Sequence, residues 1–290
     1  MAETKEKQEQ LKWEGSQATL TVTVPAREVS IAFKEIKDRA VKEVKISGFR
    51  PGKAPAHLAE KQLNEEALSQ DLFQEVVPLA YARAVSEAKL KPIIPPQITV
   101  KEYGQGKDLV FEATTAEAPK VSLGDYKKAV SKLKGSPLLG PDGKPFSDSG
   151  EVTAAQVLAA LRESVKVDVP HILIDYEVQR MLSSLIDQVR SLGMTVEQYL
   201  TSQGKKAEDL QKEYHEIADR NLKDEFILKE IAEADGVKVA EKEITDAIEA
   251  APDEKTRASL GEARGKAYLE DVLRKRKVIE SLLKLAGRKA

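Results

Sequence analysis

The sequence predicts two successive domains, a small α+β domain at the N-terminal end and an all-α domain at the C-terminal end. Between Ala18 and Val24, apolar residues alternate with threonines, the pattern of a half-buried strand. Elsewhere apolar residues recur every three or four positions, as on one face of an amphipathic helix. Strand-like alternation is absent from Val152 onward, so the predicted antiparallel sheet belongs to the first part of the chain.

The first strand is expected to end at Pro25. Helical periodicity then runs from Val29 to Gly48, and a second helix is expected to open at Pro55 and to continue towards Lys89. Prolines at three nearby positions break this second helix: Pro92, Pro95 and Pro96. Two further strands are predicted over 97–103 and 108–114, joined by a hairpin turn over 104–107.

Domain boundaries follow from composition. Four glycines and three prolines lie between Gly135 and Gly150, a composition that resists both helix and strand. We therefore predict an α+β domain over residues 1–115, a linker over 116–150 and a helical domain over 151–290.

The helical domain carries recognisable helix ends. Thr195 and Gln198 have the spacing of a capping box, and Gly204, Gly236 and Gly287 stand where helices are expected to end. No repeat of 20 to 50 residues is present, so a repeat solenoid is not supported, and a bundle with splayed helices stays open.

Composition excludes several classes of protein. The chain has no cysteine, which rules out disulfides, thiolate nucleophiles and cysteine-based zinc sites. Lys+Arg (46) nearly balances Asp+Glu (48), so the general basic excess of a nucleic-acid binder is missing. The charged first residues and the lack of a long apolar stretch predict a soluble, cytoplasmic protein with no membrane partner.

Catalytic and cofactor-binding patterns are missing as well. His57, His171 and His215 show no metal-ligand spacing, and no glycine-rich phosphate loop opens a helix. The many carboxylates fit solvated helix faces and indicate no catalytic pair. We therefore expect no metal, no cofactor and no enzyme activity.

One loop stands out between the two helices of the first domain. It reads GFRPGKAP, from Gly48 to Pro55. Two glycines permit tight backbone turns, two prolines stiffen the chain, and Phe49, flanked by Arg50 and Lys53, could anchor on another surface. The alternative is an ordinary helix connection whose phenylalanine folds back onto the core.

Local charge favours the docking interpretation. Between positions 34 and 53 the sequence has seven cationic and three acidic residues. This excess of four positive charges favours a polyanionic partner. The cations are Lys34, Lys37, Arg39, Lys42, Lys45, Arg50 and Lys53.

The same loop resembles the GFRxGKxP motif of the trigger factor family, whose N-terminal α+β domain docks beside the ribosomal exit tunnel. The resemblance assigns ribosome binding to Gly48, Phe49, Arg50, Pro51, Gly52, Lys53 and Pro55. Further on, Leu123 to Tyr126 resembles the family's exit from the N-terminal domain, and Val169 to Ile174 resembles the start of its helical C-terminal domain.

The resemblance also contains a gap. The family normally carries an FKBP-like prolyl-isomerase domain of roughly 100 residues between linker and helical domain. The segment 152–162 resembles the helix before that domain and 167–174 the segment after it, so we expect the isomerase domain to be missing near Glu163 to Lys166.

What the resemblance implies is a ribosome-associated chaperone with an elongated form and arm-like helices in its all-α C-terminal domain, without isomerase activity. Its expected partners are the large ribosomal subunit near the exit tunnel, both ribosomal protein and rRNA, and nascent or unfolded polypeptides. Whether the free protein forms a homodimer stays open. The alternatives are a prolyl isomerase like the full-length family members and a basic-loop nucleic-acid binder.

Overall fold

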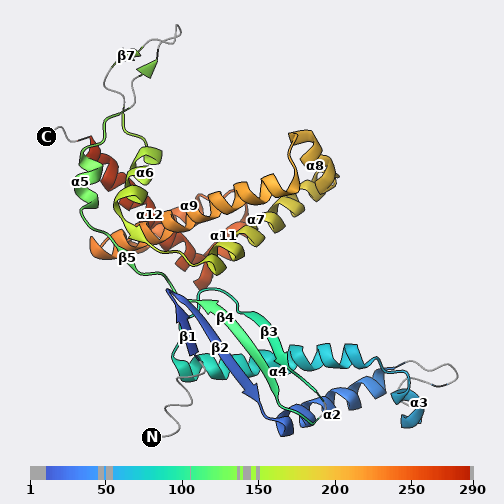
Figure 1. The fold of residues 1–290 in the computed structure, drawn as a ribbon. Coiled ribbons are helices and arrows are strands. Elements are labelled where there is room, and N and C mark those ends of the chain that lie inside the picture. Colours follow the sequence, from blue (N-terminus) through green and yellow to red (C-terminus); the bar gives the residue numbers. More distant parts are fainter. Residues whose placement is uncertain are drawn as a thin grey trace, which may run out of the picture. The chain divides into compact units, whose positions relative to one another are not determined.

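The computed structural model describes residues 11–44, 49, 55–104, 106–135, 138–139, 145–147 and 151–287. The chain divides into two compact units, unit 1 over Met1–Ala118 and unit 2 over Pro119–Ala290. Figure 1 shows the course of the chain as a ribbon. Each unit has its own hydrophobic core.

Unit 1 is a four-stranded antiparallel sheet with two long helices on one face. Its elements are β1 (Leu11–Glu14), β2 (Gln17–Val24), α2 (Ala26–Glu43), α3 (Ala56–Glu60), α4 (Glu65–Ala88), β3 (Gln97–Glu102) and β4 (Leu109–Ala116). The strand order is β1-β2-β4-β3. This confirms the predicted α+β class.

Register explains which strand residues enter the core. Val22 of β2 lies opposite Phe111 of β4, and Leu20 lies opposite Ala113. All four are buried beneath α2 and α4, while the threonines of β2 occupy the other face. Because side chains alternate along a strand, the threonine alternation visible in the sequence is the pattern of this one-sided burial.

Two details of unit 1 differ from the prediction. A short strand β1 precedes β2 and pairs with it from Leu11↔Leu20 to Glu14↔Gln17. The expected single helix from Pro55 is two helices, because the Asn64 side chain accepts hydrogen bonds from the backbone of Glu66 (2.8 Å) and Ala67 (3.3 Å) and so begins α4 as a new helix.

Unit 2 is almost entirely helical. Its elements are β5 (Val121–Ser122), α5 (Tyr126–Ser131), β6 (Leu138–Leu139), β7 (Pro145–Ser147), α6 (Ala154–Ser164), β8 (Lys166–Val167), α7 (His171–Ser191), α8 (Val196–Gln203), α9 (Ala207–Ala234), α10 (Glu241–Glu249), α11 (Glu254–Gly261) and α12 (Ala263–Ala286). The helical class of the second domain is thereby confirmed, with only two-stranded pairings added by β5 with β8 and β6 with β7.

The body of unit 2 is the part where α5, α6, α9 and α12 share one core. Val157, Leu161 and Ile227 are fully buried there, and Val278 is 1% exposed. A two-pronged ion pair joins α6 to α9 at the edge of this core, where Arg162 Nη1 donates to both carboxylate oxygens of Asp224 at 2.7 and 2.6 Å.

Two groups of helices continue from the body. In the first, α7 and α9 lie side by side and α8 covers their far end, with a small core of Leu185, Val189 and Leu210 (Figure 1). In the second, α10 and α11 pack against α12. We call these groups the α7–α9 arm and the α10–α12 arm.

The predicted helix ends are mostly present. Thr195 and Gln198 form the expected capping box, and Gly204 closes α8 in the left-handed conformation at φ 62°. Gly236 is left-handed just past α9. Gly287 ends α12 with φ −78°, so no left-handed turn is needed there.

The segment predicted as a linker, 116–150, contains structured elements of unit 2. Tyr126 and Val130 of α5 are buried in the core of the body. The Tyr126 hydroxyl donates to Asp235 at 3.1 Å and Lys127 donates to the same carboxylate at 2.7 Å. Unit 2 therefore begins at Pro119, because these apolar and polar contacts attach α5 to the end of α9.

Candidate functional site

The predicted docking loop lies between α2 and α3. Gly48, Arg50, Pro51, Gly52 and Lys53 fall outside the described residues. The two described members are accessible: Phe49 is 44% exposed, and Pro55 is exposed as the residue that precedes α3.

Local sequence explains how the chain enters and leaves this loop. Val44 ends α2 in an extended conformation, with its amide donating to the Ala40 carbonyl at 2.9 Å. Pro55 precedes the first helical residue of α3 with φ −58°, and the proline ring holds φ near this value. The loop is thus a connection between two helix ends, as the sequence predicts.

The positive charge near the loop is smaller than the sequence count. Arg39 forms an ion pair with Glu75 of α4, and Lys37 Nζ lies 2.9 Å from Glu60 of α3. The hydrogen bond and charge of Glu75 raise the pKa of Arg39. Both acidic partners come from outside the stretch 34–53, so only the folded chain reveals this neutralisation.

Two other cationic residues of α2 are exposed and are not paired with an acidic side chain of the described residues. Lys34 and Lys42 are exposed, and within the described part of the chain neither forms an ion pair. Together with Phe49 they give this end of unit 1 an apolar side chain and unpaired cations. Such a surface attracts acidic partners in a salt-dependent way.

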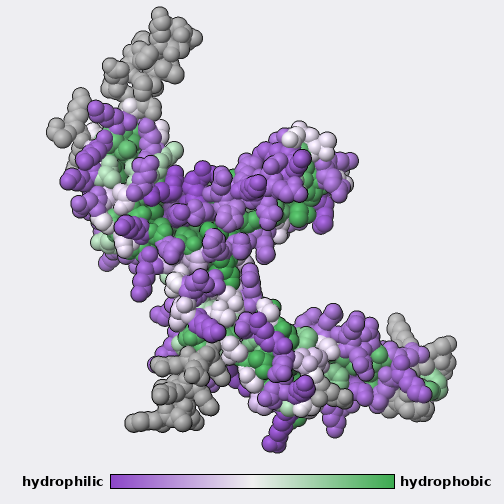
Figure 2. Space-filling model, viewed as in Figure 1, coloured by the Kyte–Doolittle hydropathy of each residue, from purple (hydrophilic) through white to green (hydrophobic). Residues whose placement is uncertain are grey.

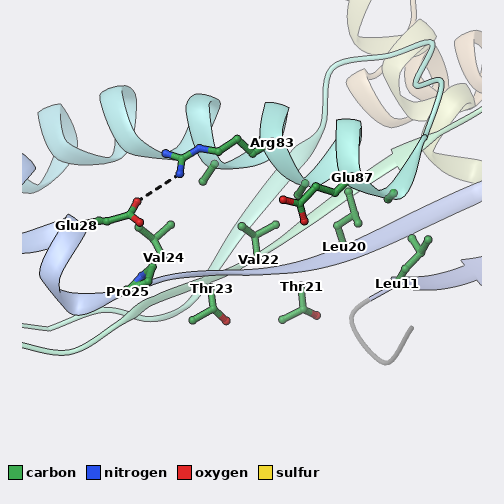
Figure 3. A pocket seen from close by; sticks show the side chains of 13 residues that line it. Leu11, Leu20, Thr21, Val22, Thr23, Val24, Pro25, Glu28, Arg83 and Glu87 are labelled. Carbon is green, nitrogen blue, oxygen red and sulfur yellow. Dashed lines mark ion pairs between the residues drawn. The ribbon is translucent and has the colours of Figure 1, made fainter. Parts of the chain in front are cut away.

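A separate cavity of about 270 Å³ lies between β2 and α4. Figure 3 shows Leu20, Val22 and Val24 directed towards α4, while Thr21 and Thr23 point away from it. Glu28 and Arg83 form an ion pair across it at 3.5 Å. Its lining contains no histidine, cysteine or serine, and its two threonines point away from α4 (Figure 3).

Tertiary structure brings together two histidines that are far apart in sequence. His171 of α7 and His215 of α9 have ring centroids 6.4 Å apart. A catalytic zinc site needs about three protein ligands, and the described residues contain no group of three or more histidine, aspartate or glutamate side chains that could hold a metal. The pair therefore gives no metal centre.

Unit 2 presents large apolar side chains at its surface. Figure 2 shows hydrophobic residues between hydrophilic ones along the α7–α9 arm. The most exposed of them are Leu192 at 73% on this arm and Tyr268 at 64% on α12, with Tyr176, Ile186 and Val272 less exposed. Sequence periodicity could not single these residues out, because their exposure depends on how the helices pair.

Methionine and tyrosine positions that could serve a flexible binding surface are partly in the core. Met194 and Tyr199 pack against Leu185, Val189 and Leu210, as expected for ordinary core residues. Met181 lines a shallow depression on the α7–α9 arm together with Tyr214.

Within the described ranges, no helix combines the length and apolar content needed to cross a membrane.

Two family profiles match the chain. The profile of the bacterial trigger factor protein covers residues 4–135, and the profile of the bacterial trigger factor C-terminus covers residues 148–284. Residues 136–147 are the interval between the two matches.

Individual proteins agree with the profiles. The trigger factors of Staphylococcus aureus strains JH9 and Newman are each 42% identical over 116 residues, which cover 40% of this chain and 27% of the relative. The chain thus matches about a quarter of these relatives' length.

One solved structure is similar over most of the chain. It is described as "Promiscuous Substrate Recognition in Folding and Assembly Activities of the Trigger Factor Chaperone". It aligns with a TM-score of 0.60 over 95% of this chain and 98% of its own, at 14% identity, a likeness that concerns the fold. From the two profile matches, supported by these relatives, the chain belongs to the trigger factor family.

Proposed function

We propose that this protein is a cytoplasmic, ribosome-docking chaperone in which unit 1 binds the ribosome and unit 2 holds nascent or unfolded polypeptides. The observation that carries the proposal is the GFRPGKAP sequence between α2 and α3. The exposure of Phe49 favours docking over the alternative in which this ring folds onto the core.

In the proposed docking, Phe49 is the apolar anchor, and Arg50 and Lys53 supply charges for the large subunit near the exit tunnel, where ribosomal protein and rRNA meet. Gly48, Pro51, Gly52 and Pro55 shape the loop. An anchor surrounded by cations gives an attraction that weakens with salt.

Client holding is proposed for the exposed apolar side chains of unit 2. Leu192 and Tyr268 lie on different arms and are separated by charged residues. Dispersed apolar contacts of this kind bind many unfolded sequences weakly, because no deep pocket selects one side chain.

The comparisons support this function at the level of the family. The Staphylococcus aureus relatives are trigger factors, and the similar structure concerns substrate recognition by the trigger factor chaperone. Because the matched stretch is 27% of the relatives, their complete activity is not transferred directly.

We also propose that the chain lacks prolyl-isomerase activity. The interval 136–147 between the profile matches is far shorter than a domain of about 50 residues or more. A peptide cis/trans assay tests this: a rate equal to the uncatalysed one is expected, and clear catalysis would favour the alternative, an isomerase like full-length family members.

Changing Phe49, Arg50 and Lys53 together to alanine tests the docking. Co-sedimentation with ribosomes should fall to background, because both the anchor and the two cations are removed. The control is Lys12→Ala with Lys91→Ala, which removes two exposed cations of unit 1 outside the loop. Undiminished sedimentation of the triple variant would refute the docking assignment.

A further inference from the structure

A concave surface of unit 1 is lined by residues of α2 and of the connection between α3 and α4. It is a groove of about 1130 Å³ between α2, the α3–α4 connection and the turn after β3. We call it the α2–Tyr103 groove. Its floor is formed by Val29, Phe33, Leu63 and Leu68, and Tyr103 forms one wall.

The floor is apolar and firmly held. Val29 and Leu68 are each only 5% exposed, and Phe33 and Leu63 are partly buried against the unit 1 core. An apolar side chain placed on this floor would be removed from water without disturbing the core. The groove therefore has the character of a preformed anchor pocket.

The wall is fixed by two contacts. The Tyr103 ring packs edge-on against Phe73, with centroids 4.9 Å apart. The Tyr103 and Ser69 hydroxyl oxygens lie 3.3 Å apart. Tyr103 nevertheless stays 36% exposed and so presents a rigid aromatic surface. Because the ring is already ordered, binding a partner would cost little further side-chain entropy.

The rim is positively charged. Lys34 and Lys61 line the groove, and the described residues include no ion-pair partner for either. Lys37, which also lines it, is neutralised by Glu60 at 2.9 Å. The remaining carboxylate, Glu65, lies in the first turn of α4, where the helix dipole stabilises it. The unpaired rim charges favour an acidic partner segment.

The size of the loop points to this groove as well. From Gly48 to Pro55 the loop has eight residues, whereas a stable interface uses about 20 residues or more on each side. Neighbouring surface must contribute if docking is stable. The lining of the groove includes residues of α2, the element directly before the loop, and Glu60 at the end of α3, the element directly after it.

We propose that the α2–Tyr103 groove is a second contact of the docking surface and receives an apolar side chain on an acidic segment of a ribosomal protein. This inference rests on the proposed docking function. Protein is favoured over RNA because the floor is recessed and three of its four residues are aliphatic, whereas single-stranded RNA is bound by several open aromatic platforms.

Charge reversal at the rim tests the proposal quantitatively. Lys34→Glu with Lys61→Glu should raise the Kd for ribosomes about fivefold or more and flatten its salt dependence, since rim charges steer association. The matched control, Lys12→Glu with Lys91→Glu, makes the same change in net charge outside the groove and should have a smaller effect. Equal effects of the two pairs would overturn the proposal.

Site-specific crosslinking identifies what occupies the groove. Because the sequence has no cysteine, Ser30→Cys at the groove edge can carry a single photo-crosslinker and leaves both rim lysines intact. We expect a crosslink to a ribosomal protein, with none from Ser86→Cys, an exposed position on α4 outside the groove. Crosslinking to rRNA, or no crosslink while the protein is ribosome-bound, contradicts the proposal.

The docking function and the role of the groove can be refuted separately. If the triple alanine variant of the loop still binds ribosomes, the docking function is wrong. If that variant loses binding while the rim and control pairs behave alike, docking stands and only the role of the groove is refuted.

Discussion

The body and the arms of unit 2 are built from the same kinds of residue but are packed very differently. In the body, Val157, Leu161 and Ile227 are completely buried. In the arms, α8, α10 and α11 contain no buried residue. The small core under α8, at the far end of the α7–α9 arm, has three buried members, Leu185, Val189 and Leu210. The body therefore supplies stability, and the arms supply surface.

This difference suits a protein that holds unfolded chains. Thinly packed elements open locally at low free-energy cost, and their apolar side chains remain accessible. Leu192, at 73% exposure, gains little from folding but could bind a client. The contacts within the body must then hold both arms in place.

The largest expected effect is in the body. Leu161→Ala should lower the free energy of unfolding by about 3 kcal/mol, because the residue is fully buried and leaves a cavity. Leu185→Ala in the α7–α9 arm, where the residue is 8% exposed, should cost clearly less since the thin core can collapse. Urea unfolding measures both, and equal losses would contradict the division into body and arms.

A charge change tests the edge of the body. Burial is the main cause that raises the pKa of Asp224, although the hydrogen bond and charge of Arg162 act to lower it. The Asp224 side chain is 17% exposed, and removing the arginine takes away its ion-pair partner. Arg162→Ala should therefore cost about 2 kcal/mol at pH 7, somewhat below a fully buried pair.

The pH dependence of this variant has a defined sign. A folded-state pKa above the unfolded value means that the folded protein is favoured when Asp224 is protonated, and that this advantage is lost as the pH rises through the folded pKa. The deficit of Arg162→Ala should therefore be complete at pH 7 and shrink on acidification towards the raised pKa. Chemical unfolding at a series of pH values checks this, and a deficit that grows on acidification would contradict it.

A smaller effect is expected in the α10–α12 arm. A Cβ at Gly265 would clash with the Ser259 carbonyl oxygen and lie 2.5 Å from Leu260 Cα, so α11 must move away. Gly265→Ala should destabilise this arm by about 1–2 kcal/mol, the usual cost of overpacking. Hydrogen exchange of the α11 amides should accelerate while that of α6 stays unchanged.

Gly261→Ala is the control for that change, because nothing lies within 4 Å of the added Cβ. Equal exchange rates in α11 for the two variants would show that the close approach of α11 and α12 does not matter.

The smallest effect on stability is expected at the most exposed apolar residue. Leu192→Ser should change the unfolding free energy by less than about 0.5 kcal/mol, yet weaken suppression of aggregation of a denatured client protein. Leu200→Ser, which alters a partly buried residue of the same arm, should lower stability instead. Unchanged client protection by Leu192→Ser would remove this residue from the proposed client surface.

Much of the fold was predictable because local patterns and final structure agree. The threonine alternation of β2 gave a strand, and Thr195 with Gln198 gave a capped helix. Asn64 was a missed local clue, since an asparagine before two glutamates is a helix start. Strand β1 was not predicted, because a four-residue edge strand, LKWE, is too short for a clear pattern.

The candidate site was predictable as a motif but not as a surface. Nothing in the sequence relates Tyr103 to Phe33, or Glu75 to Arg39, because these pairs come from different elements. The unpaired state of Lys34 and the rigidity of Tyr103 emerge only when the helices pack.

By itself, the sequence determined the two fold classes, the family and the position of the loop proposed for docking, because periodicity, capping and an eight-residue motif are local properties. Only the tertiary structure decided that α5 belongs to unit 2 and which cations near the loop are already neutralised. It also decided which apolar side chains of the arms stay exposed. These are contacts between distant residues, and no local pattern encodes them.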